Sequence, residues 1–224
     1  YELAVILQDG MRRMYQDQED VYYYITVMNE NYTHPGMPVG AEEGIRKGLY
    51  KFRVGRSGTH SVQLMGSGSI LREVIKAAEI LERDYSVSAT VWSATSFTEL
   101  QRDGVDAERR NRLNPDNDRV VPWVEQCMEG LSGPVIAATD YVRAFAEQIR
   151  PFLPQQDYTV LGTDGFGRSD TRENLRRFFE VDSSNVVYAT LYALHKRGDL
   201  SVEELLRARK NLGLDADKPN PLHV

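Results

Sequence analysis

Between residues 50 and 162, short runs of β-branched and apolar residues alternate with segments of helical periodicity. A chain that alternates in this way forms right-handed crossovers, which place the strands parallel and the helices on both faces of the sheet. We therefore predict an α/β fold, a three-layer domain with a mostly parallel sheet of about five strands. The predicted strands are 50–54, 61–65, 87–94, 135–139 and 158–162.

Helices are predicted where apolar residues recur every three or four positions. The last of them begins with a capping box, Ser201 followed three residues later by Glu204, and Gly213 stands where a helix would end. The first two strands are separated by a Gly/Arg/Ser turn, which favours a hairpin with one antiparallel edge. The predicted helices are 70–85, 97–113, 123–128, 141–152, 171–180, 184–197 and 201–211.

The first 48 residues follow another pattern. An amphipathic helix is predicted at 1–17, and because it begins on an apolar stripe without a cap, we expect the chain to belong to something larger. The run at 21–28 is β-branched and aromatic, and predicts a strand buried on both faces. A loop rich in Pro and Gly and a short helix at 40–49 follow. We therefore predict two units, 1–48 and 49–224.

Composition excludes several classes of protein. The net charge is −6, and a nucleic-acid groove needs concentrated Lys and Arg. No run of about 18 apolar residues is present, so no membrane-spanning helix is expected. Cys127 is the single cysteine and the four histidines lie far apart, which argues against a disulfide framework and a zinc site and fits a reducing cytoplasm.

Gly66, Gly68 and two serines form a glycine-rich turn that follows a predicted strand and opens a helix. Backbone N–H groups at such a place can hold a phosphate. A dinucleotide-binding fingerprint, however, needs a third glycine where Arg72 stands and an acid at the end of the next strand. We interpret the turn as a tight connection whose serines cap the helix.

The segment 161–170, LGTDGFGRSD, carries three glycines and two acids at the carboxyl end of a strand, where open α/β sheets bind ligands. It lacks the lysine of a phosphate-binding loop, and its spacing is not that of a calcium loop. We expect a structural or interface loop, with Asp170 or Ser169 capping the next helix.

The polar segment 29–34, NENYTH, follows the predicted buried strand and has the composition of an active-site rim. His34 has no sequence neighbour with which to form a catalytic pair. Cys127 lies in a short helix without a nearby histidine, so we expect a packed thiol. His195 ends a helix, where a cation suits the dipole. We assign no catalytic, cofactor-binding or metal-binding residue.

Several motifs nevertheless resemble those of homodimeric pyruvate dehydrogenase E1 components. The resemblance is collinear over essentially the whole chain. The segments that carry it are VYYYIT with NENY (21–32), GAEEGIRKG (40–48), LMGSGSIL (64–71), TSFTEL (95–100), LGTDGFGRSD (161–170) and DADK (215–218).

The resemblance implies a transketolase-like C-terminal domain at 49–224, preceded by the last helix and strand of a pyrimidine-binding domain. It also implies a parent enzyme that decarboxylates pyruvate on thiamine diphosphate with Mg²⁺ and reductively acetylates the lipoyl group of E2. The expected partners are the rest of E1, a second E1 subunit and E2 dihydrolipoyl acetyltransferase, in the cytoplasm. The catalytic and cofactor-binding residues would lie upstream of Tyr1.

Two alternatives remain open from the sequence. One is a free-standing regulatory or ligand-binding α/β module that uses the 162–170 loop. The other is that a different transketolase-like enzyme contains this segment.

Overall fold

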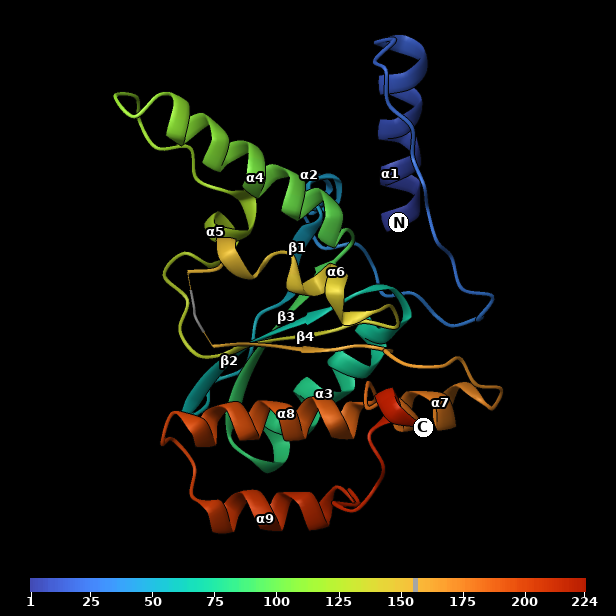
Figure 1. Cartoon of the computed structure of the whole chain (residues 1–224), viewed down its shortest axis with the longest axis vertical. Coiled ribbons are helices and arrows are strands. Elements are labelled where there is room, and N and C mark those ends of the chain that lie inside the picture. The colour runs from blue at the N-terminus through green and yellow to red at the C-terminus, as the bar shows by residue number, and fades with distance from the viewer. Residues whose placement is uncertain (155–156) are drawn as a thin grey trace.

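A computed structural model describes residues 1–154 and 157–224, and its centre is one sheet of order β1-β3-β2-β4-β5 (Figure 1). β2 pairs in parallel with β3 and with β4, and β4 pairs in parallel with β5. β1 is antiparallel to β3 at one edge. The predicted five-stranded, mostly parallel sheet is confirmed. The strands are β1 Leu49–Arg53, β2 His60–Gly66, β3 Val87–Ala94, β4 Val135–Ala138 and β5 Tyr158–Leu161.

The prediction of a hairpin between the first two strands is wrong, because β3 lies between them. The β1–β2 connection passes over the start of β3 with almost no clearance. A Cβ atom on Gly55 would lie 2.7 Å from the backbone N of Ala89, and one on Gly58 would lie 2.5 Å from the carbonyl O of Ser86. These glycines let the chain cross β3 instead of turning back beside β1. The register of β1 also shifts between Lys51 and Arg53.

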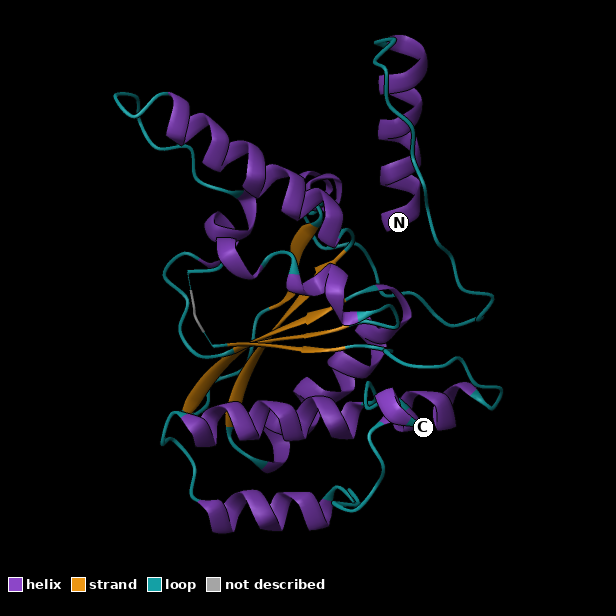
Figure 2. Ribbon diagram, viewed as in Figure 1, coloured by secondary structure: helices purple, strands orange, loops and turns teal. Residues whose placement is uncertain are grey.

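Helices cover both faces of the sheet (Figure 2). Successive side chains of a strand point to opposite faces, so one strand supplies both layers. In β2, Leu64 packs into the cluster beneath α3, α8 and α9, whereas Met65 packs beneath α4, α5 and α6. Helix bounds are α3 Leu71–Asp84, α4 Phe97–Leu113, α5 Trp123–Met128, α6 Arg143–Glu147, α7 Arg172–Phe178, α8 Ser183–Lys196 and α9 Val202–Asn211.

Most predicted helices agree with these bounds. The capping box of Ser201 and Glu204 is present, and Gly213 has a positive φ of 66°. The exception is the continuous helix predicted at 141–152. It is broken into α6 and a 3-10 turn, Arg150–Phe152, because Pro151 has no N–H with which to continue the α-helical hydrogen bonds.

The N-terminal residues extend away from this domain (Figure 1). The predicted helix at 1–17 is confirmed as α1, Glu2–Met11, with a π-helical turn at Arg12–Gln16, and the helix predicted at 40–49 is α2, Glu42–Lys47. The base of α1 is anchored by Glu2, whose carboxylate accepts hydrogen bonds from Tyr50 (2.7 Å) and Ser93 (2.6 Å).

The strand predicted at 21–28 is wrong in this structure, since these residues form no strand and most are exposed. A strand needs a neighbour to bond its backbone, and the segment instead runs back along α1. Tyr23 packs against Gly10 and donates a hydrogen bond to Asp9 at 2.8 Å. The β-branched and aromatic composition therefore does not by itself produce a strand here.

Leu64→Ala tests the importance of β2. Leu64 is fully buried in the middle of the sheet, so we expect the substitution to lower the free energy of unfolding by about 2–5 kcal/mol. The matched control is Leu206→Ala on α9, where the leucine is 47% exposed and the expected change is within about 0.5 kcal/mol. Urea unfolding measures both, and equal losses would contradict the assignment of the core.

Candidate functional site

The carboxyl ends of the parallel strands are the first place to look for a site. After β2 the chain adds β3 on one side, whereas β4 lies on the other, so the order reverses between β2 and β4. Open α/β sheets bind ligands at such a reversal. Here the segments that follow β2 and β4 are hydrogen-bonded to each other. The backbone N of Ser67 donates to the carbonyl of Ala138 at 3.1 Å, and the Ser69 hydroxyl donates to Asp140 at 3.2 Å.

The glycine-rich turn at 66–70 is built for close packing. A Cβ atom on Gly66 would lie 2.6 Å from the Cα of Leu71. The predicted tight turn is confirmed, but the prediction that its serines cap the helix is wrong, because Ser67 makes no side-chain cap and Ser69 bonds Asp140 instead. Since Ser69 faces a carboxylate, the turn offers poor surroundings for a phosphate.

The first half of the 162–170 loop is engaged in contacts within the chain. The Thr163 hydroxyl donates to the carbonyl of Asp140 at 2.6 Å. The Asp164 carboxylate accepts the backbone N–H of Arg143, the first residue of α6, at 3.1 Å. It also pairs with the Arg143 guanidinium. Gly165 has a φ of 104°, and a Cβ atom there would lie 2.5 Å from the carbonyl O of Pro221 in the C-terminal tail.

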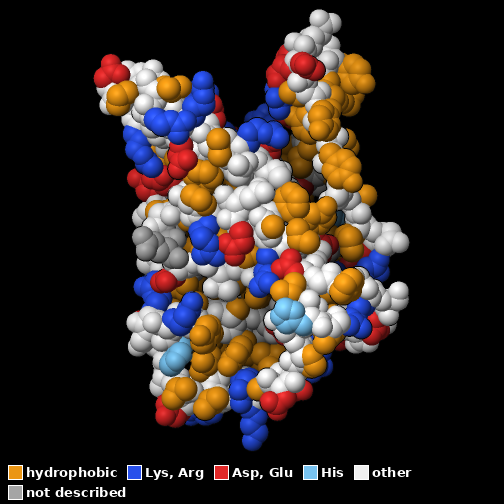
Figure 3. All heavy atoms as spheres, in the orientation of Figure 1, with side chains coloured by type: hydrophobic (Ala, Val, Ile, Leu, Met, Phe, Trp, Pro, Cys, Tyr) orange, Lys and Arg blue, Asp and Glu red, His pale blue; other side chains and the backbone are white. Residues whose placement is uncertain are grey.

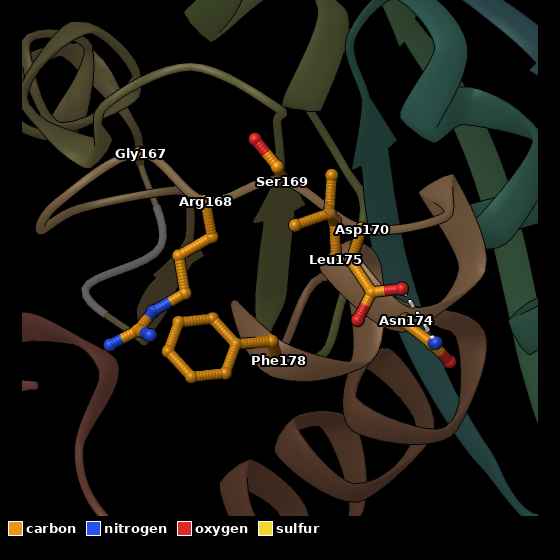
Figure 4. Close-up of a pocket in the computed structure, with 7 residues that line it drawn as sticks. All are labelled: Gly167, Arg168, Ser169, Asp170, Asn174, Leu175 and Phe178. Atoms are coloured by element: carbon orange, nitrogen blue, oxygen red, sulfur yellow. Dashed lines mark hydrogen bonds between the residues drawn. The ribbon is translucent and has the colours of Figure 1, made fainter.

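The second half of the loop lines a surface hollow of about 440 Å³ (Figure 4). Figure 4 shows the Arg168 side chain beside the ring of Phe178, and its guanidinium carbon lies 4.6 Å from the ring centroid. Asp170 accepts from the backbone N of Thr171 at 2.6 Å and from the Asn174 amide at 2.8 Å.

The side chain that caps α7 is Thr171, which accepts from the backbone N of Asn174, so the predicted cap by Asp170 or Ser169 is wrong by one or two positions. Thr163, Asp164 and Asp170 of this loop bond residues in neighbouring segments of the chain, which does not favour the alternative of a separate ligand-binding module.

The segment 29–34 meets the same edge of the sheet. Glu30 pairs with two arginines of α7, Arg176 at 2.8 Å and Arg172 at 3.7 Å. It also pairs with Arg72 of α3 at 3.3 Å. Arg176 also reaches Glu73 at 3.4 Å.

His34 stacks on Tyr32 with 4.8 Å between ring centroids and joins no other predicted site residue. The sequence did not identify Arg72, Arg172 and Arg176 as partners of this segment. One signal was present: Glu30 is the only Asp, Glu, Lys or Arg between Asp20 and Glu42.

A second hollow, of about 360 Å³, lies beside the edge strand β1 and contains Cys127. The indole N–H of Trp123 donates to the carbonyl of Leu49 at 2.9 Å, and the ammonium of Lys47 lies 4.2 Å from the Trp123 ring centroid. Burial raises the pKa of the Cys127 thiol to about 12, although Lys51 and Lys47 lower it in part. The expected packed thiol fits this geometry, because a nucleophilic cysteine needs a lowered pKa.

Within residues 1–154 and 157–224, no group of three or more His, Cys, Asp or Glu side chains is placed to hold a metal ion. Over the same ranges no helix has the length and apolar character needed to cross a membrane. His195 lies in the last turn of α8, as predicted, and its Nδ1 lies 2.9 Å from the carbonyl O of Leu200.

Comparisons with known proteins divide the chain in two. A family model described as the transketolase-like TK C-terminal domain matches residues 48–182, and one described as the pyruvate dehydrogenase E1 component middle domain matches residues 1–35.

Curated relatives match the whole chain. The pyruvate dehydrogenase E1 component of Cupriavidus necator is 57% identical over an alignment of 226 positions, which covers 100% of this chain and 25% of the relative. That of Escherichia coli K12 is 56% identical and covers 99% and 25%. The chain thus spans about a quarter of the length of these relatives. A solved transketolase from Pichia stipitis, complexed with xylulose-5-phosphate, matches with a TM-score of 0.48 at 16% identity, over 75% of this chain and 22% of that one.

Gly165→Ala is expected to destabilise the protein. Alanine at a φ of 104° is strained and would press on Pro221, so we expect a loss of about 1 kcal/mol or more in the free energy of unfolding. Gly167→Ala is the control, since nothing lies within 4 Å of its Cβ position. Thermal or urea unfolding compares them, and an unaffected Gly165→Ala variant would remove the structural explanation of this loop.

Cys127 is expected to react slowly with thiol reagents. A pKa raised from 9.0 to about 12 means that the folded protein binds the thiol proton more tightly than the unfolded chain does. The associated stabilisation is complete below pH 9 and is lost as the pH rises towards 12. At pH 7 the thiolate fraction should be about a thousandfold smaller in the folded state. A chromogenic disulfide reagent, with the guanidinium-unfolded protein as control, measures this, and equal rates would contradict it.

Proposed function

This chain belongs to the transketolase-like C-terminal domain family, and we propose that it serves as the C-terminal part of a pyruvate dehydrogenase E1 component. In this role it supports folding, dimerisation and assembly, while residues outside the chain carry the chemistry. The observation that carries the proposal is 57% identity along the full chain to an E1 component, of which the chain covers 25%. The order of the two matched models, middle domain before C-terminal domain, agrees with it.

We place the division between the two units at 1–48 and 49–224. The middle-domain model ends at residue 35 and the C-terminal model begins at 48, and the segment between them is the Pro- and Gly-rich connection. Many apolar side chains are exposed on the first unit, and Figure 3 shows them gathered along one side of it. We expect the remainder of the middle domain to cover this side, because exposed apolar patches of this kind mark interfaces. The exposed large apolar side chains of this unit are Leu3, Leu7, Met11, Tyr15, Tyr22, Tyr24, Val27, Met28, Met37 and Val39.

In this proposal the whole enzyme is a cytoplasmic homodimer. It decarboxylates pyruvate with thiamine diphosphate and Mg²⁺ and transfers the acetyl group to the lipoyl group of an E2 acetyltransferase. Thiamine diphosphate, when bound, supplies the carbanion chemistry.

The described residues of this chain do not fit the cofactor. A diphosphate with Mg²⁺ needs carboxylate and carbonyl oxygens for the metal and free donors for the phosphates. In the described ranges, no group of three or more His, Cys, Asp or Glu is placed to hold a metal ion. Arg72, Arg172 and Arg176 are paired with Glu30. The Ser69 hydroxyl is bonded to Asp140, and the Arg168 guanidinium lies over the Phe178 ring. We therefore derive no step of the reaction from these side chains.

The test is an activity assay of residues 1–224 with pyruvate, thiamine diphosphate, Mg²⁺ and an artificial electron acceptor. We expect no turnover above background, since the proposed catalytic residues lie outside the chain. The matched control is the intact protein that carries these residues, assayed at the same concentration, and it is expected to be active.

Turnover by the 224-residue chain would contradict the claim that catalysis lies elsewhere. An intact protein without pyruvate decarboxylation would contradict the assignment to pyruvate dehydrogenase. The two outcomes therefore test the role of the chain and the identity of the enzyme separately.

A further inference from the structure

Residues 21–39 connect the N-terminal helix to the C-terminal domain without any helix or strand. Figure 1 shows this segment running back along α1, looping outward and returning to α2. Within the described chain, no backbone–backbone hydrogen bond joins residues 22–37 to other residues. An irregular segment of this length needs some other interaction to hold it in one place, because ordering each residue costs about 1–2 kcal/mol.

The interaction comes from the side chain of Glu30. Although its neighbours in sequence are exposed, the Glu30 side chain is only 17% exposed, and that of its closest partner, Arg176, is 13% exposed. One carboxylate oxygen meets Arg72 at 3.3 Å and the other meets Arg176 at 2.8 Å. Both oxygens of the carboxylate are therefore engaged by guanidinium groups from two different helices.

The flanking residues are held by the same arginines. Arg172 donates to both the backbone carbonyl and the side-chain oxygen of Asn29. The guanidinium carbon of Arg72 lies 4.4 Å from the centroid of the Tyr32 ring, within the range of a cation–π contact. Arginines of α3 and α7 in the C-terminal domain thus contact Asn29, Glu30 and Tyr32.

The arginines are themselves fixed. Arg176 also pairs with Glu73 at 3.4 Å, and Glu73 accepts the backbone N–H of Ser183 at 3.2 Å and pairs with Lys76 at 3.3 Å. Isolated surface ion pairs contribute little to stability. A partly buried network with a shared arginine contributes more, because its charges are less screened by water. Loss of the Glu30 carboxylate would remove the acid that Arg72 and Arg172 share and would leave their guanidinium groups near that of Arg176, which is costly because the network is partly buried.

We propose that residues 29–32 form an arginine-locked strap, in which Glu30 fixes the N-terminal unit to the carboxyl edge of the C-terminal sheet. The base of α1 is held separately by Glu2 with Tyr50 and Ser93. The strap is the second attachment, and together the two attachments set the orientation of residues 1–28 relative to the sheet. The strap depends only on these contacts and stands whether or not the proposed function does.

The test measures distances in the intact protein that carries these residues. Spin labels are placed on Thr33→Cys, beside the strap, and on Glu203→Cys, exposed on α9, in a Cys127→Ser background. Labelled protein is mixed with an excess of unlabelled protein, so that only distances within one subunit are measured. Double electron–electron resonance should then give a single narrow distance distribution in this parent. Glu30→Gln and Arg176→Gln should each lose the narrow peak, because the segment then samples several positions. The double variant should broaden the distance distribution little beyond either single variant, since both substitutions remove the same ion pair.

Glu129→Gln is the control, an exposed carboxylate for which the described residues provide no ion pair, and it should keep the narrow peak. Slow hydrogen exchange in β2 and β3 identifies variants whose sheet remains folded. If Glu30→Gln unfolds the sheet, Arg172→Gln, at the more exposed side of the network, replaces it with the same expected loss. A narrow distribution retained in a folded Glu30→Gln or Arg172→Gln variant would overturn the strap.

Discussion

The structure depends on the position of β2, which is hydrogen-bonded along both edges and covered on both faces. Val62 and Leu64 belong to one apolar cluster and Met65 to the other, so a single strand joins the two helical layers. The chain adds β3 on one side of β2 and β4 on the other. The loops after β2 and β4 consequently meet, and the hydrogen bonds from Ser67 to Ala138 and from Ser69 to Asp140 follow from that meeting.

Local patterns predicted most of this domain. Periodicity located β3 and α4 at their observed bounds, because both have an apolar face that the sheet buries. The capping box at Ser201 was equally readable, since it needs only residues three positions apart. Features that depend on one short stretch of sequence were therefore accessible without the structure.

Features that depend on distant residues were not. The run at 21–28 has the composition of a strand, yet strand formation requires a partner that the described chain does not supply. The predicted hairpin failed because β3, which begins at Val87, pairs with β1 and lies between β1 and β2. The partners of Glu30 lie 42 to 146 positions away, so spacing alone could not have identified them.

The candidate sites show why glycine-rich motifs alone do not indicate chemistry. The turn at 66–70 and the loop at 162–170 lie where ligands bind in many α/β sheets, and both have the residue types of binding loops. Their polar groups are nevertheless bonded within the chain: Ser69 to Asp140, and Asp164 to Arg143. Position in the fold made these segments candidates, and the state of their hydrogen bonds decided their role.

The edge strand β1 has a consequence for assembly. An exposed sheet edge can recruit a strand from another molecule and so start an intermolecular sheet. β1 is short, its register shifts between Lys51 and Arg53, and its Leu49 carbonyl already accepts the Trp123 indole. The exposed charge of Lys51 opposes the approach of a further strand. This edge therefore disfavours the addition of a strand from another molecule, so the protein can remain concentrated without polymerising along it.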